Sequence, residues 1–147
     1  MKICIVISDY YKDISRDLLN GSINELKKNG FRNIKIKKVS GAFEIPNIIS
    51  KNINKFKAFI ALGCVIKGET DHYYFISNAV TNGLMYLSIK SKKPIGFGIL
   101  TCKNLKQAKY RSSLLKKNKG KEVAKGIISI LNNKWNINFH QQKTQEF

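Results

Sequence analysis

The chain has 147 residues, enough for one domain of ordinary size with its own hydrophobic core. Hydrophobic residues make up 43% and charged residues 24% of it, a composition that excludes an intrinsically disordered chain and a coiled coil. The net charge of +18 is compatible with a nucleic-acid or anionic-membrane partner, but 24 lysines against three arginines, with 21 isoleucines and 15 asparagines, also indicate the codon bias of an A/T-rich genome.

Apolar segments and helical periodicities alternate along the chain, which is typical of βα units around a parallel sheet. Segments rich in Ile, Val and Phe predict strands at 2–7, 34–39, 56–66 and 95–100. Apolar residues at helical spacing predict helices at 14–26, where Gly30 follows as a stop, and at 45–54, 73–87, 104–111 and 120–131. We therefore expect an α/β fold: a three-layer α/β/α sandwich with a four-stranded parallel sheet, forming a single domain over residues 1–147. Residues 136–147 lack a period and are expected to form a mobile tail.

The cysteines and the apolar segments bear on where the protein works. Cys4, Cys64 and Cys102 are odd in number and have no metal-ligand spacing, so they predict reduced thiols in the cytoplasm. No apolar segment is long enough for a signal peptide or a membrane span. The two histidines, His72 and His140, stand far apart in the sequence, and no metal site is expected.

The ends of the first two predicted strands carry aromatic and acidic side chains. Ligands of such sheets bind beyond the carboxyl ends of the strands, so these loops are expected to hold the chemistry. Tyr10 and Tyr11 follow the first strand, where one ring can stack on a planar heterocycle or both can simply cover the start of a helix. Phe43 and Glu44 follow the second strand, and Glu44 is either a ligand-facing carboxylate or a counter-ion in a lysine-rich chain.

The end of the third predicted strand is the most informative segment. It runs through Gly68, Glu69 and Thr70 into a helix, whose free backbone N–H groups predict an anion site. Thr70 or Asp71 can equally be the N-cap of that helix. His72 stands beside the predicted anion site, where it is either an ordinary surface residue or a proton carrier, because an imidazole exchanges protons near neutral pH.

The region after the fourth predicted strand contains one of the three arginines, Arg111. In a chain that uses lysine elsewhere, an arginine suggests a need for the planar fork that binds phosphate or carboxylate. A surface arginine without a ligand is the alternative. GFG at 96–98 lacks the third glycine of a dinucleotide-binding motif and predicts no such site.

Four motifs, taken in order, resemble those of the lumazine synthase family: VSGAFEIP at 39–46, LGCVIKGETDHY at 62–73, PIGFGILT at 94–101 with QAKYR at 107–111, and NKG at 118–120. The resemblance extends from Lys2 to about Leu131. It implies a flavodoxin-like fold and a transferase that works without a cofactor. The implied reaction condenses 5-amino-6-(D-ribitylamino)uracil with 3,4-dihydroxy-2-butanone 4-phosphate to 6,7-dimethyl-8-ribityllumazine, the penultimate step of riboflavin biosynthesis.

The resemblance also implies a role for individual positions. His72 would carry protons for Schiff-base formation and phosphate elimination, and Arg111 would pair with the substrate phosphate. The other substrate-binding positions that it implies are Tyr10, Ala42, Phe43, Glu44, Cys64, Val65, Ile66, Glu69, Thr70, Phe97 and Lys119. Phe97, Arg111 and Lys119 would reach the site from an adjacent copy of the chain. The chain departs from the family pattern at Tyr11, where an asparagine is usual, and at Asp9, where a basic residue is common.

The implied assembly is a closed homopentamer with shared active sites. A free pentamer is expected here over a sixty-subunit shell, because only Met1 precedes the first predicted strand and because chains of charge +18 repel one another. Two other functions are kept as alternatives. One is an archaeal-type riboflavin synthase of the same fold, and the other, from a different class, is a basic nucleic-acid-binding domain.

Overall fold

The computed structural model describes residues 1–132, so the tail expected at 136–147 lies outside the described residues. The described residues contain one sheet with strand order β2-β1-β3-β4. All of its strand pairs are parallel. The strands are β1 (Ile3–Ser8), β2 (Ile34–Val39), β3 (Ala58–Ile66) and β4 (Ile95–Cys102). The predicted four-stranded parallel sheet is confirmed.

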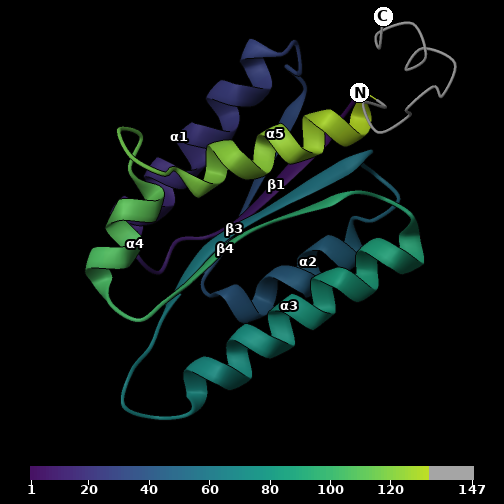
Figure 1. Ribbon diagram of the computed structural model, residues 1–147. Coiled ribbons are helices and arrows are strands. Elements are labelled where there is room, and N and C mark those ends of the chain that lie inside the picture. Colours follow the sequence, from purple (N-terminus) through teal and green to yellow (C-terminus); the bar gives the residue numbers. More distant parts are fainter. Residues whose placement is uncertain (133–147) are drawn as a thin grey trace, which may run out of the picture.

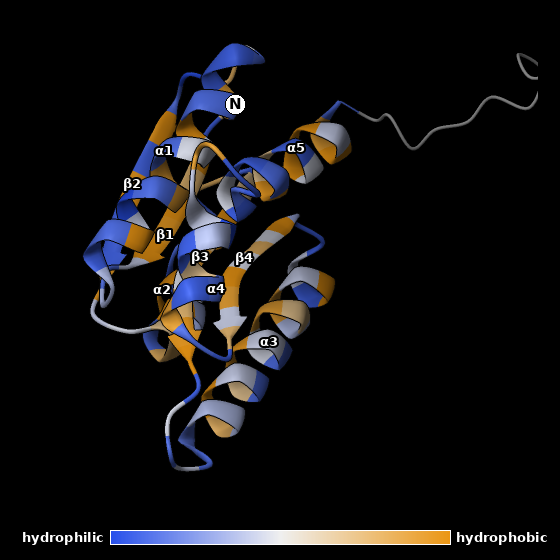
Figure 2. Ribbon diagram, turned by 60° about the vertical axis from the view of Figure 1, so that its left-hand side comes forward, coloured by the Kyte–Doolittle hydropathy of each residue, from blue (hydrophilic) through white to orange (hydrophobic). Residues whose placement is uncertain are grey.

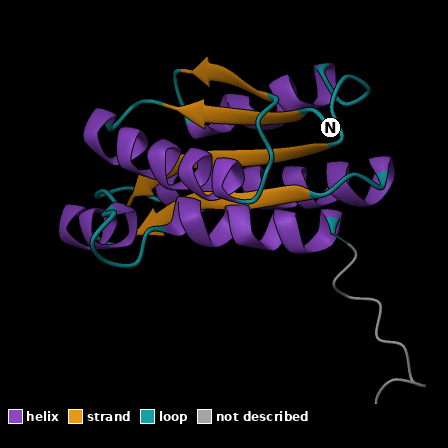
Figure 3. Cartoon of the chain, turned by 90° about the horizontal axis from the view of Figure 1, so that it is seen from above, coloured by secondary structure: helices purple, strands orange, loops and turns teal. Residues whose placement is uncertain are grey.

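Helices cover both faces of the sheet (Figure 1). One face packs against α1 (Lys12–Lys28), α4 (Leu105–Ser112) and α5 (Lys119–Leu131), and the other packs against α2 (Ile45–Lys51) and α3 (His72–Ser91). Seen from above, the strands run between the two helical layers (Figure 3), which confirms the three-layer α/β/α sandwich. None of the described helices combines the length and the apolar character that crossing a membrane requires.

The central strands are apolar throughout because each has a hydrophobic core on both sides. Along β1, Ile3, Ile5 and Ile7 face the core under α1 and α5, whereas Cys4 and Val6 face the core under α2 and α3. The strand β2 lies at one edge of the sheet and alternates isoleucine with lysine (Figure 2). Its lysines at 35 and 38 are exposed.

Several elements end at other residues than predicted, mostly by one to four positions. The segment 39–46, expected as a loop, contains a short 3₁₀ helix, η1 (Ala42–Glu44), that leads directly into α2. Pro46 fits this start, since the first turn of a helix needs no donor from its backbone nitrogen. The strand β4 extends to Cys102, and α3 extends to Ser91, where Lys92 ends it with a φ of 60°. Gly30 follows α1 with a φ of 89°, as the sequence predicts.

Candidate active site

The end of β1 presents two tyrosine rings. Tyr10 is 73% exposed, and its ring centroid lies 4.9 Å from that of Tyr11 at an interplanar angle of 74°. Tyr11 is partly buried against the core under α1. The buried ring therefore holds the exposed one in an edge-to-face contact, and Tyr10 has the exposure that stacking on a ligand requires.

The three predicted site residues in the turn after β2 differ in how far they are buried. Ala42 is buried in the core under α2 and α3, whereas Phe43 is 59% exposed and Glu44 is also exposed. The 3₁₀ helix thus uses Ala42 as its anchor and presents a phenyl ring and a carboxylate to solvent beyond the carboxyl end of the sheet.

The end of β3 holds the next three predicted residues, and their side chains alternate. Cys64 is buried and Ile66 half-buried against the core under α1 and α5, while Val65 packs partly against the opposite core. Burial raises the pKa of the Cys64 thiol to about 12 from an ordinary value of 9.0. The thiol is buried and stays protonated well above neutral pH, so the contribution of this segment to a ligand would come from its backbone and from Val65 and Ile66.

The turn from β3 to α3 leaves the first amides of a 20-residue helix without acceptors inside the helix. Asp71 is the N-cap by backbone position, but its side chain does not cap an amide of the helix. Thr70 Oγ1 instead accepts a hydrogen bond of 3.3 Å from the backbone nitrogen of His72. Glu69, Thr70 and His72 are all exposed, so the predicted anion site and the imidazole lie at the same solvent-facing helix start.

A pocket of about 360 Å³ lies along β4 and the starts of the elements around it. It brings together Phe97, Arg111 and Lys119, the residues that the sequence suggested as one group, and Tyr73 lines it as well. We call it the cationic pocket; its other lining residues are Ile99, Leu100, Thr101, Cys102, Lys103 and Gln107. Tyr73 and Lys103 were not predicted, although Tyr73 directly follows His72 and Lys103 directly follows β4.

Lys119 and Arg111, two of the cations in the cationic pocket, differ in whether an acidic side chain lies beside them. Lys119 Nζ lies 3.1 Å from Glu122 Oε1. Within residues 1–132, no carboxylate oxygen lies within 4.0 Å of the Arg111 guanidinium. Arg111 is close enough to Cys102 to oppose the rise in pKa that burial causes for that thiol. The guanidinium is thus available to an anionic ligand at the carboxyl end of β4.

A second pocket, of about 430 Å³, lies between the last turns of α2 and α3 and is lined by Ile53, Tyr86, Lys90 and Lys93 among others. The last turns of these helices lead into the starts of β3 and β4, so this pocket is at the amino ends of the strands. Ligands of parallel sheets bind at the carboxyl ends. We therefore assign the candidate site to the cationic pocket and the strand ends described above, although the other pocket is larger.

The raised pKa of Cys64 predicts how stability depends on pH. The native state disfavours the thiolate, so this thiol contributes stability that is present below its ordinary pKa and is lost as the pH rises toward the native value. We expect the free energy of unfolding to fall between about pH 9 and pH 11, and to fall less steeply in Cys64→Ala. Denaturant titrations across this interval measure both slopes. Val65→Ala, which removes packing but no thiol, is the control, and equal slopes in all three proteins would contradict the prediction.

Comparison with known proteins identifies the family of the chain. The family model described as 6,7-dimethyl-8-ribityllumazine synthase matches residues 1–134. Proteins of that name from Leuconostoc mesenteroides and Limosilactobacillus reuteri are 39% and 37% identical to this chain over 135 and 139 residues; these alignments cover 89% and 93% of the chain, and 86% and 91% of the relatives. The protein of that name from Buchnera aphidicola is 44% identical over 136 residues, which cover 88% of this chain and 85% of the relative. This chain therefore belongs to the 6,7-dimethyl-8-ribityllumazine synthase family.

Proposed function

We propose that this chain condenses 5-amino-6-(D-ribitylamino)uracil with 3,4-dihydroxy-2-butanone 4-phosphate, giving 6,7-dimethyl-8-ribityllumazine, phosphate and water. The observation that carries the proposal is the cationic pocket, because it joins Phe97, Arg111 and Lys119 at the carboxyl end of the sheet in a chain of this family. An aromatic ring beside a guanidinium that has no carboxylate partner among residues 1–132 suits a reaction between a planar pyrimidine and a phosphate ester.

The pyrimidine would bind at the strand ends. Tyr10 would stack on its ring, and Ala42, Phe43 and Glu44 would contact the ring and its ribityl chain, with the carboxylate accepting hydrogen bonds from hydroxyls. Residues 64–66 would add backbone contacts. The exposure of Tyr10 and Phe43 supports this role, since both rings present apolar surface to solvent that a bound heterocycle would cover.

The phosphate would bind between the start of α3 of one copy and the cationic pocket of an adjacent copy. Backbone N–H groups at Glu69 and Thr70 would bind the negative charge, as free amides at a helix N-terminus do. Arg111 would pair with the phosphate in a bidentate manner, and Lys119 would add a second positive charge. The carboxylate of Glu122 is largely exposed to solvent, so its ion pair with Lys119 is weak. A phosphate can therefore replace Glu122 beside Lys119 with little loss of free energy.

His72 would move protons in this reaction. The primary amine of the pyrimidine attacks the ketone, water leaves as the Schiff base forms, phosphate is eliminated, and ring closure releases a further water. Each step transfers a proton to or from an oxygen or nitrogen of the substrates. The imidazole of His72 is exposed at the helix start that would hold the phosphate. It would therefore lie beside the substrate atoms that gain or lose these protons.

The experiment is to mix the protein with both substrates and to follow the absorbance of the lumazine. Incubation with lumazine alone is the control for a riboflavin synthase of the same fold, and riboflavin in that control would favour the alternative. We place the reaction in the cytoplasm, which the three unpaired cysteines of the described residues support.

We infer that the active form is a closed ring of copies, a homopentamer, in which Phe97, Arg111 and Lys119 complete the site of a neighbour. An exposed apolar surface supports this inference. Phe75, Met85 and Ile89 on α3 are 72%, 60% and 70% exposed, and Phe97 on the edge strand β4 is 39% exposed. A second copy would bury this surface, whereas a monomer would leave it in water.

Substitution on α3 tests this assembly. Met85→Glu and Ile89→Glu place charges on the exposed apolar surface, so we expect each to dissociate the ring and to abolish the condensation while the monomer stays folded. Sedimentation and the activity assay measure the two effects. Ile130→Glu, at an exposed position of α5, should change neither, and an active monomer would contradict the shared site.

A further inference from the structure

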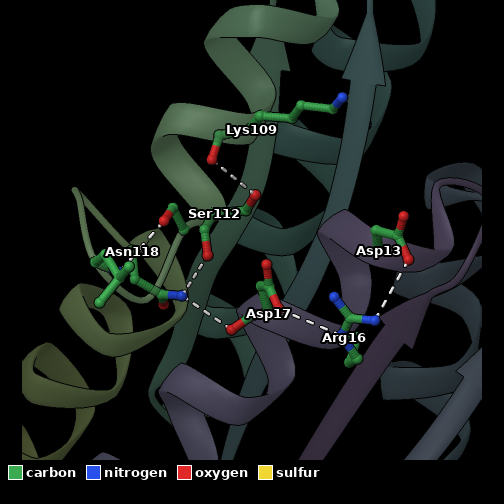
Figure 4. A network of polar contacts seen from close by, with 8 residues as sticks. Asp13, Arg16, Asp17, Lys109, Ser112 and Asn118 are labelled. Atoms are coloured by element: carbon green, nitrogen blue, oxygen red, sulfur yellow. Dashed lines mark hydrogen bonds and ion pairs between the residues drawn. The ribbon is translucent and has the colours of Figure 1, made fainter.

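One buried side chain joins the two segments that carry the cations of the site. Asn118 lies in the connection between α4 and α5 and is 7% exposed. Its Nδ2 donates to the backbone oxygen of Ser112 at 2.5 Å and to that of Asp17 on α1 at 2.9 Å (Figure 4). Its Oδ1 accepts from the backbone nitrogen of Lys121 at 2.8 Å. Both donors and the acceptor of the amide are therefore used.

The positions of these bonds relate directly to the cationic pocket. Ser112 is the last residue of α4 and directly follows Arg111, and Lys119 is the first residue of α5 and directly follows Asn118. The bond to Lys121 caps α5, and the bond to Ser112 fixes the end of α4. The bond to Asp17 attaches both helix ends to α1, which is 101 residues away in the chain. One amide thus sets where Arg111 and Lys119 lie relative to each other.

Two glycines near Asn118 provide the space in which its amide lies. A Cβ at Gly21 of α1 would lie 2.0 Å from Asn118 Oδ1, and a Cβ at Gly120 would lie 2.0 Å from the backbone oxygen of Leu18. Ser22 of α1 donates from Oγ to the backbone oxygen of Gly120 at 2.7 Å. Helix α1 therefore approaches the start of α5 closely enough that the amide fits only because residue 21 has no side chain.

We propose that Asn118 is a positioning residue for the phosphate-bearing substrate, and that Gly21 serves the same purpose from α1 by leaving room for it. The inference rests on the proposed function, in which Arg111 and Lys119 bind the phosphate. Asn118 touches no substrate; it acts by holding the two cations at the spacing that one phosphate bridges. Its loss therefore weakens the binding of the butanone phosphate and leaves the binding of the pyrimidine almost unchanged, because the pyrimidine contacts lie on other elements.

Two variants separate the positioning role from the capping role. Asn118→Ser keeps an oxygen that can cap α5 but is too short to reach Ser112 and Asp17. Gly21→Ala leaves Asn118 in the chain but fills the space that its amide occupies. Gly126→Ala is the matched control, since this glycine also lies within a helix and a Cβ there would meet nothing within 4 Å.

The experiment measures KM for each substrate separately, with thermal unfolding and sedimentation of every variant. We expect Asn118→Ser and Gly21→Ala to raise KM for the butanone phosphate about tenfold and to change KM for the pyrimidine less than about twofold. Gly126→Ala should match the parent protein in both constants.

The possible outcomes separate this inference from the function on which it rests. If Arg111→Lys raises KM for the butanone phosphate but Asn118→Ser and Gly21→Ala do not, the positioning role is wrong and the proposed phosphate site stands. Equal rises for both substrates in the two variants also overturn it, because they indicate general loosening of the fold. If Arg111→Lys itself has no effect, the proposed phosphate site is wrong and the inference falls with it.

Discussion

Replacing His72 with alanine is expected to slow the condensation about a hundredfold without abolishing it. General acid–base groups contribute roughly 10²–10⁴-fold to a rate. We expect the low end of this range, because the amine and the ketone also react with each other unaided. Turnover at saturating concentrations of both substrates measures the effect. The substitution removes an exposed side chain, so the fold should be retained.

Lys90→Ala, at an exposed position in the last turn of α3 and to one side of the face that carries Phe75, Met85 and Ile89, is the control for effects of the substitution on the helix itself. Its rate should equal that of the parent protein. If His72→Ala also turned over at the parent rate, the imidazole would have no part in proton transfer. In that case the residue would be an ordinary surface histidine at the start of α3, the alternative that the sequence left open.

Arg111→Lys is expected to raise KM for the butanone phosphate by about ten- to a hundredfold and to leave KM for the pyrimidine nearly unchanged. Lysine keeps the charge but cannot form the bidentate pair of a guanidinium, so one charge-assisted hydrogen bond is lost, worth roughly 1.5–3 kcal/mol. Steady-state kinetics in which one substrate is varied at saturating levels of the other measure both constants.

Arg32→Lys provides the matched control, because it makes the same exchange at an exposed position just before β2, on a different element from the cationic pocket. It should have no effect on either constant. An unchanged KM for the butanone phosphate in Arg111→Lys would place the phosphate outside the cationic pocket.

Most of the fold could be predicted because it follows from local patterns. The strands are short apolar segments and the helices have apolar residues at helical spacing, so both are visible in the order of residue types. The strand order of the sheet is not visible in this way, since it depends on contacts between segments far apart in the chain. The 3₁₀ helix over residues 42–44 was missed because Gly41 and Pro46 also fit a loop.

The candidate site was predictable where its residues directly follow strands or begin a helix, as Tyr10, Glu44 and His72 do. Family resemblance supplied Phe97 and Lys119, which stand in no pattern of their own, and the structure brings both into one pocket with Arg111. Tyr73 and Lys103 were missed because their inclusion depends on how α3 and α4 meet β4. The contacts of Asn118 could not be predicted at all, because its partner on α1 is 101 residues away.

The lysines of β2 have a consequence for how the chain behaves in a crowded solution. An open sheet edge offers unpaired amides and carbonyls to any other extended strand, and a chain with 21 isoleucines contains many such strands while it folds. Lys35 and Lys38 place exposed positive charges along that edge, so two copies that approach edge to edge repel each other before their backbones can pair. A lysine content that codon bias alone would explain thus also protects the protein from aggregating through its own sheet.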